Sequence, residues 1–156
     1  MTIYTEQDLI DLRNQKTRRF IALGIPCALL LAAVIYAFAT RLEWLASAAT
    51  IIIGIILIAG YDLTLKPLLC YERHLNNCLH GRSRECDLPF VSLSDHVDLV
   101  EGVHFRQLLC ADYDGKGRPY DRLFYFDAHK ALPDIKPGDM LHIVHHDLFI
   151  SNVYPQ

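Results

Sequence analysis

Two long uncharged apolar stretches near the start of the chain restrict its fold more than any other feature. The first contains 21 residues between Arg19 and Arg41, and the second contains 18 residues between Glu43 and Asp62. A helix needs about 20 mostly apolar residues to cross the hydrocarbon core of a bilayer. The sequence therefore predicts two transmembrane helices, at 20–40 and at about 44–61, and a protein that contacts membrane lipid.

The two predicted helices form a hairpin within residues 20–65, because only a few residues, from Thr40 to Glu43, connect them. Basic residues near the spans are Arg13, Lys16, Arg18, Arg19, Lys66, Arg73, Arg82 and Arg84 outside the hairpin, and Arg41 in its connection. Lys and Arg near spans stay on the cytoplasmic side. We therefore predict an inner or plasma membrane protein with both termini in the cytoplasm, in which residues 1–19 form a cytoplasmic N-terminal segment.

A secretory signal is the alternative interpretation of the first apolar stretch. Basic residues precede it, and Ala37-Phe38-Ala39 has the small-residue pattern of a cleavage site. The stretch is long enough to span, however, and a second span follows almost at once. The sequence favours an uncleaved hairpin and leaves cleavage at this site open.

Each predicted helix carries one row of small residues at four-residue spacing. The rows are Gly24, Ala28 and Ala32 in the first helix, and Ala46, Thr50 and Gly54 in the second. Small residues let helix backbones approach each other in lipid. The rows therefore predict contacts that close the hairpin or join copies into a homo-oligomer, with chance spacing as the plain alternative. Neither stretch contains a charged residue or His, which argues against a transporter built from the hairpin alone.

Residues 66–81 have the pattern of a short amphipathic helix. Pro67 stands near its start and Gly81 just after its end, as expected at helix boundaries. The apolar face consists of Leu68, Tyr71, Leu75, Cys78 and Leu79. We expect this helix to lie on the membrane surface or against the following domain.

The same segment contains the one group of residues that indicates a metal site. Cys70, His74 and Cys78 follow one another at four-residue spacing, and Cys86 lies nearby in the sequence. Cys70 and Cys78 would be about 12 Å apart on a continuous helix, too far to share one zinc ion. A pair that includes His74 could bind zinc if Cys86 and another group completed the site. The alternative is that Cys78 is a small core residue, His74 a boundary residue, and no cofactor is bound.

From residue 82 the pattern changes to short strand-like runs separated by turn residues. The predicted strands are 83–86, 90–93, 96–99, 103–113, 120–127, 140–145 and 148–153. Asp114-Gly115-Lys116-Gly117 predicts a hairpin between the two longest runs, and Lys136-Pro137-Gly138-Asp139 predicts a turn into a second hairpin. Many short strands in a small domain favour a cytoplasmic antiparallel β-barrel of OB or SH3 type at residues 82–156, because closure removes open edges.

The expected fold is therefore an α+β membrane protein, with a transmembrane hairpin, a short amphipathic helix at 66–81 and a small barrel. In this layout the sequence resembles the NfeD-like membrane proteins; no motif matches residue by residue, and no function is carried across. The predicted barrel core is Phe90, Val97, Leu99, Val103, Phe105, Leu109, Leu123, Tyr125, Leu141, Ile143, Phe149 and Ile150.

The sequence gives no indication of an enzyme. Asp95-His96, Asp127-Ala128-His129 and His145-His146-Asp147 place carboxylates beside imidazoles, yet no nucleophile motif or phosphate-binding glycine loop accompanies them. All eight histidines follow residue 73, which leaves a pH-sensing role open. His142, which alternates with apolar neighbours, is expected to face solvent or a partner.

A nucleic-acid partner is unfavourable, because the net charge of the chain is −3. The residues that could stack on bases or bind phosphate are Tyr113, Tyr120, Phe124, Tyr125, Arg106, Arg118 and Arg122. Aromatic residues in a small barrel more often belong to the core.

The sequence thus favours a membrane-anchored assembly or adaptor protein, a scaffold that presents a cytoplasmic barrel for self-association or for docking an unidentified protein partner. Two alternatives stay open: a subunit of an oligomeric pore or transporter, and a metal- or redox-responsive sensor that uses Cys70, His74, Cys78 and Cys86.

Overall fold

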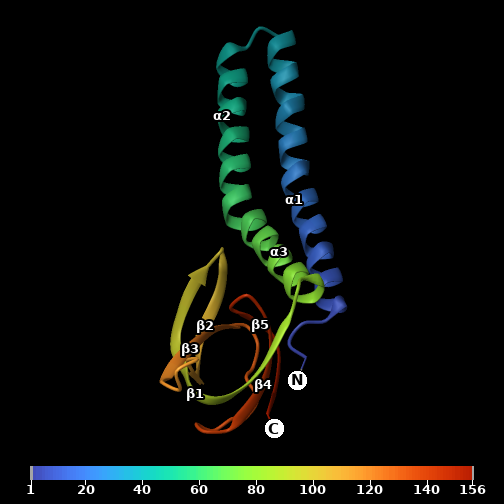
Figure 1. Cartoon of the computed structure of the whole chain (residues 1–156). Helices are drawn as coiled ribbons and strands as arrows, with labels where there is room; N and C mark the ends of the chain where they lie inside the picture. Colours follow the sequence, from blue (N-terminus) through green and yellow to red (C-terminus); the bar gives the residue numbers. More distant parts are fainter. Residues whose placement is uncertain (1, 156) are drawn as a thin grey trace. The chain divides into compact units, whose positions relative to one another are not determined.

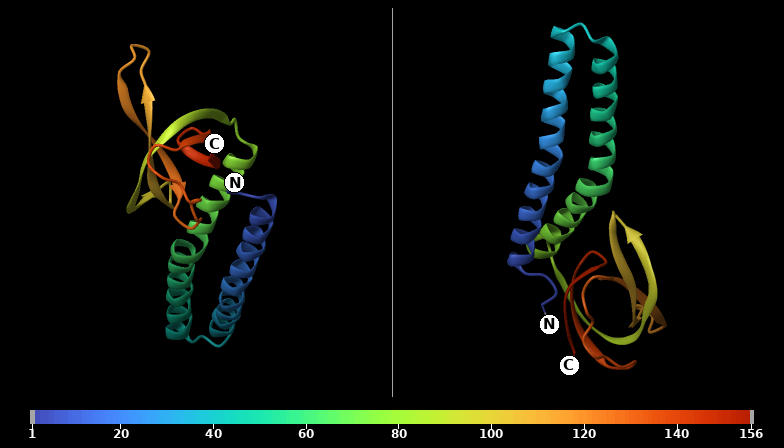
Figure 2. Two further views of the ribbon diagram at one scale, coloured as in Figure 1. Left: turned by 90° about the horizontal axis from the view of Figure 1, so that it is seen from below. Right: turned by 180° about the vertical axis from the view of Figure 1, so that it is seen from behind.

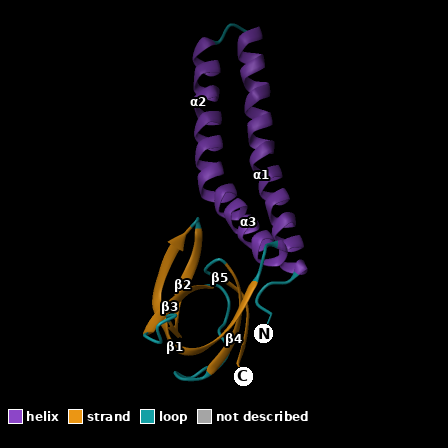
Figure 3. Cartoon of the chain, viewed as in Figure 1, coloured by secondary structure: helices purple, strands orange, loops and turns teal. Residues whose placement is uncertain are grey.

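The computed structural model describes residues 2–155, which form two compact units (Figures 1 and 3). One unit contains residues Ile10–Leu69, and the other contains the chain up to Leu9 together with the chain from Cys70 onward. The helices are α1 (Glu6–Ala39), α2 (Glu43–Gly60), the π-helical segment η1 (Tyr61–Leu65) and α3 (Lys66–His80). The strands are β1 (Arg84–Val100), β2 (Val103–Tyr113), β3 (Pro119–Asp127), β4 (Met140–His146) and β5 (Phe149–Pro155).

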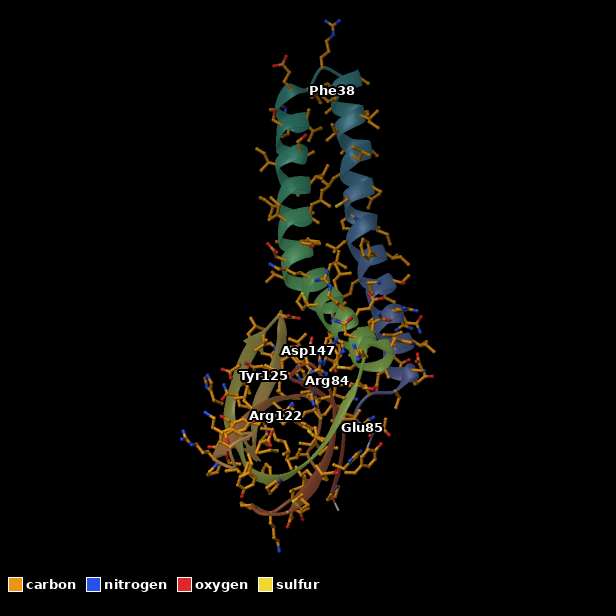
Figure 4. All side chains as sticks on the ribbon, viewed as in Figure 1. Phe38, Arg84, Glu85, Arg122, Tyr125 and Asp147 are labelled. Carbon is orange, nitrogen blue, oxygen red and sulfur yellow. The ribbon has the colours of Figure 1, made fainter. Side chains whose placement is uncertain are left out.

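The first unit is an antiparallel hairpin of α1 and α2, which run side by side in Figures 1 and 2. The amide of Leu42 donates to the carbonyl of Ala37 at 2.9 Å and closes the short connection, beside which Phe38 lies (Figure 4). Arg41 adopts a left-handed conformation there, with φ of 57°. Both helical segments have the length and apolar composition needed to cross a membrane.

Helix α1 begins 14 residues before the predicted span, at Glu6 rather than Phe20. The Thr5 hydroxyl accepts a hydrogen bond from the Asp8 amide at 3.3 Å, and the Asp8 carboxylate accepts one from the Thr5 amide at 2.9 Å. This reciprocal pair is a capping box, which satisfies amide groups that a helix start leaves open. The cap explains why the helix starts in a polar segment.

The predicted helix at 66–81 is confirmed as α3, and it continues from α2 without a break in helical structure. Segment η1 joins the two, with the Lys66 amide donating to the carbonyl of Tyr61. Pro67 has no amide to donate to the turn before it, and its ring crowds that turn, so a wider π turn is the expected accommodation. The Gly81 amide bonds to Asn77 at 2.8 Å and marks the end of the helix.

The second unit contains a closed barrel with strand order β1-β2-β3-β5-β4. All neighbours pair antiparallel except β3 and β5, which pair in parallel at Tyr125 and Phe149. The predicted hairpin of β2 with β3 is confirmed along all of β3 and along β2 from Phe105 to Tyr113, and the later pairing of β4 with β5 is confirmed as well. The α+β class and the closed barrel are confirmed, whereas the expectation that the barrel is antiparallel throughout is wrong, because β5 closes it on β3 in parallel. The OB or SH3 type stays a prediction.

The three short strands expected between 83 and 99 are wrong as separate elements, because the structure has one strand, β1, in their place. Residues 84–89 pair with β4, and residues 90–100 pair with β2. The register shifts at Phe90/Ser92 and at Leu93/Val97. Such bulges bend a strand, so the polar residues that suggested turns are where one strand curves from one neighbour to the next.

The predicted barrel core is half correct. Phe90, Val103, Phe105, Leu141, Ile143 and Ile150 are buried as expected. On β3, however, Phe124 and Phe126 face inward in place of Leu123 and Tyr125, and on β2 Leu108 replaces Leu109. Val97 and Leu99 are exposed. Because the side-chain period of a strand is two, a one-residue difference in phase moves every side chain to the other face.

The start of the chain forms part of the barrel unit. Thr2 pairs with Asn152 of β5 as an isolated bridge, and the Ile3 amide bonds to the carbonyl of Ser151 at 3.4 Å. Ile3, Tyr4 and Leu9 are buried in the same apolar cluster as the barrel side chains. Residues 2–9, called the N-terminal segment from here on, are thus a structural part of the barrel core, whereas the sequence predicted only a cytoplasmic segment there.

Candidate functional site

A buried polar cluster lies in the barrel unit where α3, β3 and the N-terminal segment meet. We use the name "buried polar cluster" for Tyr4, Tyr71, His74, Cys78 and Asp127. The Tyr71 hydroxyl donates to Asp127 Oδ2 at 2.7 Å, and the Tyr4 hydroxyl donates to the same oxygen at 3.2 Å. Tyr4 Oη also lies 2.9 Å from His74 Nε2. The cluster therefore ties three segments that are far apart in the sequence.

The local structure explains how these side chains converge. Tyr71, His74 and Cys78 are spaced by three and four residues on α3, so they share one face of the helix. Asp127 is the last residue of β3 and also accepts a hydrogen bond from the His129 amide at 2.8 Å. Tyr4 precedes the capped start of α1. Helix periodicity, a strand end and a helix cap thus each supply part of the cluster.

The His74 ring is enclosed by aromatic side chains. Its centroid lies 4.9 Å from that of Phe105 and 5.2 Å from that of Phe149, both in edge-to-face geometry. The expectation that His74 is a boundary residue is wrong, because its exposed fraction is only 8%. Since the single Tyr4 proton is donated to Asp127, the bond to His74 requires a proton on Nε2 of the imidazole.

Burial sets the protonation states of the cluster. It lowers the pKa of His74 to about 4, so the imidazole is neutral near pH 7. It raises the pKa of the Cys78 thiol to about 12. Burial, followed by the nearby Asp127, raises the pKa of Tyr4, and burial with the hydrogen bond to Asp127 raises that of Tyr71. A protonated thiol and neutral tyrosines are poor nucleophiles and bases, so the arrangement favours a structural role for the cluster.

A cavity of about 510 Å³ opens beside this cluster, within the same unit. We name it the α3 cavity; its lining residues are Cys70, Arg73, His74, Val100, Glu101, Val103, Phe105 and Phe149. Glu101 and Gly102 form the tight turn between β1 and β2, with φ of 52° and 81°. Positive φ at both central residues is the geometry of a type I′ hairpin turn. A Cβ on Gly102 would lie 2.8 Å from the sulfur of Cys70, so glycine allows this turn to approach α3.

The predicted zinc ligands are only partly brought together. Cys78 Sγ lies 3.6 Å from His74 Nε2, while Cys70 lines the α3 cavity and Cys86 lies on β1 opposite Ile143. In residues 2–155 no group of three or more His, Cys, Asp or Glu side chains is placed to hold a metal ion. All five cysteines are free thiols.

The small-residue rows lie mostly on the open faces of the hairpin. Gly24, Ala28, Ala32 and Thr50 are exposed, Gly54 is half-buried and Ala46 is buried. A Cβ added to Gly24 or Gly54 would meet nothing within 4 Å. Within the hairpin, the most buried small residues include Ala37 and Ala49, which are outside the predicted rows.

In residues 2–155 each of the three carboxylate–imidazole segments makes a local contact of its own. His96 Nε2 lies 3.4 Å from Asp98, His145 Nδ1 contacts the carbonyl of Asp147 at 2.6 Å, and Asp127 binds the backbone of His129. His142 is partly exposed, as predicted, and its Nδ1 lies 2.7 Å from Asp87.

The prediction that Phe124 could stack on bases is wrong, because its side chain is fully buried. Tyr113 and Tyr120 are exposed. Figure 4 labels Arg122 and Tyr125 on the barrel; the Arg122 guanidinium lies over the Phe124 ring, 5.1 Å from its centroid, and bonds to Asp112 at 3.2 Å. Arg106 Nε is buried and has no hydrogen-bond partner among the described residues.

Sequence reasoning missed Tyr4 and the role of Asp127. A signal for Tyr4 was present, because Thr5 and Asp8 have capping-box spacing and Tyr4 and Leu9 occupy the positions of a hydrophobic staple. No comparable signal marks Asp127, whose partners come from α3 and the N-terminal segment.

No family model, no curated protein and no solved structure matches this chain.

Proposed function

We propose that this protein is a membrane-anchored assembly or adaptor protein. In this proposal the α1–α2 hairpin spans an inner or plasma membrane, the barrel unit lies in the cytoplasm, and copies associate through the hairpin. The barrel, of the OB or SH3 type in this proposal, then presents a repeated surface for self-association or for docking a protein partner.

The observation that carries the proposal is the shared core of the N-terminal segment and the barrel. Ile3, Tyr4 and Leu9 precede or begin the first apolar helix, and the barrel follows the second. Segments that share one core must lie on the same side of a membrane. Two crossings satisfy this condition, and the excess of Lys and Arg outside the hairpin favours the cytoplasm for that side.

The same observation argues against cleavage after Ala37-Phe38-Ala39. Cleavage there would remove Tyr4, whose hydroxyl contacts both His74 and Asp127. It would also remove Ile3 and Leu9 from the apolar cluster. A barrel without these side chains would have a cavity in its core and unpaired buried polar groups, both of which destabilise a fold.

The outer surface of the hairpin supports association in lipid. Large apolar side chains are exposed along both helices, including Ile25, Leu29, Ile35, Ile51, Ile55 and Ile58. Such a surface matches a bilayer interior. Because Gly24, Ala28 and Ala32 are exposed, they are accessible to the helices of another copy.

Mass measurement of the full-length protein in nanodiscs tests the assembly. We expect a defined oligomer, and the pair Ala28→Leu with Thr50→Leu should lower its mass by adding bulk to the exposed rows. Ala22→Leu, also exposed on α1, is the matched control and should leave the mass unchanged. A monomeric wild-type protein, or an oligomer indifferent to the paired change, contradicts the assembly proposal.

Topology is tested separately, by fusing a reporter that is active only in the cytoplasm to either end of the chain. Activity from both fusions is expected, together with an intact mass that retains the N-terminal segment. Activity from one end alone would contradict the two-crossing arrangement, and loss of the first 39 residues would show cleavage.

A further inference from the structure

The α3 cavity has the size and chemistry of a small-molecule site. Its volume of about 510 Å³ lies in the range of ligand pockets in proteins. Every lining residue comes from the barrel unit, namely from α3, β1, β2, β5 and the β1–β2 turn. Both ends of that turn are fixed in strands, so the cavity has a defined wall.

The polar lining carries one positive and one negative side chain. Arg73 comes from α3 and Glu101 from the β1–β2 turn, and both are exposed. Neither side chain forms a hydrogen bond or ion pair with another residue in the part of the chain described, 2–155. An unused guanidinium and an unused carboxylate are suited to binding a carboxylate and an ammonium group, respectively.

The remaining lining is apolar and aromatic. Phe105 and Phe149 lie 5.0 Å apart between ring centroids. Val100 and Val103 add aliphatic surface. His74 contributes no charge near pH 7, because burial lowers its pKa to about 4. The cavity thus combines a neutral apolar wall with one charge of each sign.

We propose that the α3 cavity binds a free amino acid with an aromatic or branched apolar side chain. The carboxylate of the ligand pairs with Arg73, its ammonium group pairs with Glu101, and its side chain packs against the rings. A simple organic anion would be repelled by Glu101, and a simple amine would be repelled by Arg73. A neutral apolar molecule would leave both charged groups without a partner.

Calorimetric titration of the full-length protein in nanodiscs tests this proposal with phenylalanine and leucine as probes. N-acetylphenylalanine lacks the ammonium group, and phenethylamine lacks the carboxylate. We expect each of these analogues to bind about two- to fivefold more weakly than phenylalanine, because each lacks one ion pair to an exposed charged side chain. Absence of phenylalanine and leucine binding at millimolar concentration, or equal binding of an analogue, overturns the proposal.

Substitutions of the lining residues test whether the ligand binds in the α3 cavity. Arg73→Gln and Glu101→Asn should each weaken phenylalanine binding by about two- to fivefold, because each removes one exposed ion pair. Asn is chosen because it tolerates the left-handed conformation at this position. Arg118→Gln and Asp134→Asn remove exposed charges elsewhere and should bind as the wild type does.

Val100→Phe provides an independent change, because it adds volume inside the cavity without altering its charge. It should weaken binding of phenylalanine more than binding of leucine. Hydrogen exchange of the barrel amides verifies that each variant keeps its fold. Unchanged affinity in the folded Arg73 and Glu101 variants contradicts the proposal even if an amino acid binds elsewhere.

Discussion

In the hairpin, α1 and α2 bury few side chains within their own unit, and large apolar residues such as Leu29 and Ile58 stay exposed. In the barrel unit, the side chains of Phe105, Phe124 and Phe126 are almost completely buried. The barrel unit also buries polar groups, and its fully buried Asp127 accepts hydrogen bonds from two tyrosines. The two units therefore differ in where their apolar surface goes and in whether they enclose polar groups.

The two units are therefore stabilised in different ways. The barrel unit is stabilised by its own apolar core and by satisfied buried hydrogen bonds, which are sensitive to single side-chain changes. The hairpin satisfies its backbone groups within each helix, and its exposed apolar surface is stabilised by its surroundings. Changes in the barrel should thus alter unfolding more than comparable changes in the hairpin.

The largest effect is expected from Asp127→Ala. This change leaves the Tyr4 hydroxyl, the Tyr71 hydroxyl and the His129 amide without their acceptor, and should lower the free energy of unfolding of the barrel by about 3–6 kcal/mol. Urea unfolding in detergent, followed by near-ultraviolet circular dichroism, measures the loss. Asp134→Ala, an exposed carboxylate, is the control and should change stability by less than about 0.5 kcal/mol.

Acid should destabilise the barrel through His74. Its pKa in the folded protein, about 4, lies below its ordinary value of 6.5. The unfolded chain therefore takes up a proton first, so this contribution is fully present above pH 6.5 and is lost as the pH falls toward 4. The loss is about 3 kcal/mol for a shift of this size.

The measurement is urea unfolding at a series of pH values for the wild type, His74→Phe and the exposed-residue control His96→Gln. The ionisable groups that act on or contact His74 are Tyr4, Tyr71, Cys78, Asp127 and His146. The difference between wild type and His74→Phe isolates the imidazole from the general titration of carboxylates. An unchanged pH slope in His74→Phe would show that His74 is not buried as a neutral group.

Tyr4→Phe should have an intermediate effect. It removes one donor to Asp127 and the partner of His74 Nε2, and should lower barrel stability by about 1–2 kcal/mol. Tyr36→Phe, the matched change on exposed α1, should alter stability by less than about 0.5 kcal/mol. Equal effects of the two changes in urea unfolding would contradict the contrast between the units.

The smallest effects are expected from glycines in the hairpin. Gly60→Ala brings a methyl group into the side chain of Leu23, whereas Gly54→Ala meets open space. Helix propensity favours Ala by about 1 kcal/mol, so Gly54→Ala should stabilise the hairpin by up to this amount, and Gly60→Ala should gain less or lose stability. Fluorescence of Trp44, the single tryptophan, follows unfolding of α2.

Much of the secondary structure could be predicted from local patterns. Absence of charge marked the two apolar helices, and alternation with turn residues marked β2 and β3 almost to their ends. The phase of β3 could not be read, because Leu123, Phe124, Tyr125 and Phe126 are all apolar or aromatic. Such a run offers both faces of the strand to the core, and only the closed barrel selects one.

The candidate sites were less predictable for a related reason. Spacing on α3 put His74 and Cys78 together, but a metal site requires further ligands whose positions depend on the fold. The α3 cavity combines Arg73 with Glu101, which are 28 residues apart in the sequence. The sequence shows that both residues are present, but only the fold determines that they line the same cavity.

The sequence by itself determined two apolar helices, an amphipathic helix and a strand-rich region, because these depend on charge, periodicity and turn residues over short distances. Only the tertiary structure decided that Tyr4 belongs to the barrel core and bonds to His74 and Asp127. It also decided which face of β3 is buried. Contacts of this kind depend on closure of the barrel and on the path of the chain, which no local pattern of residues records.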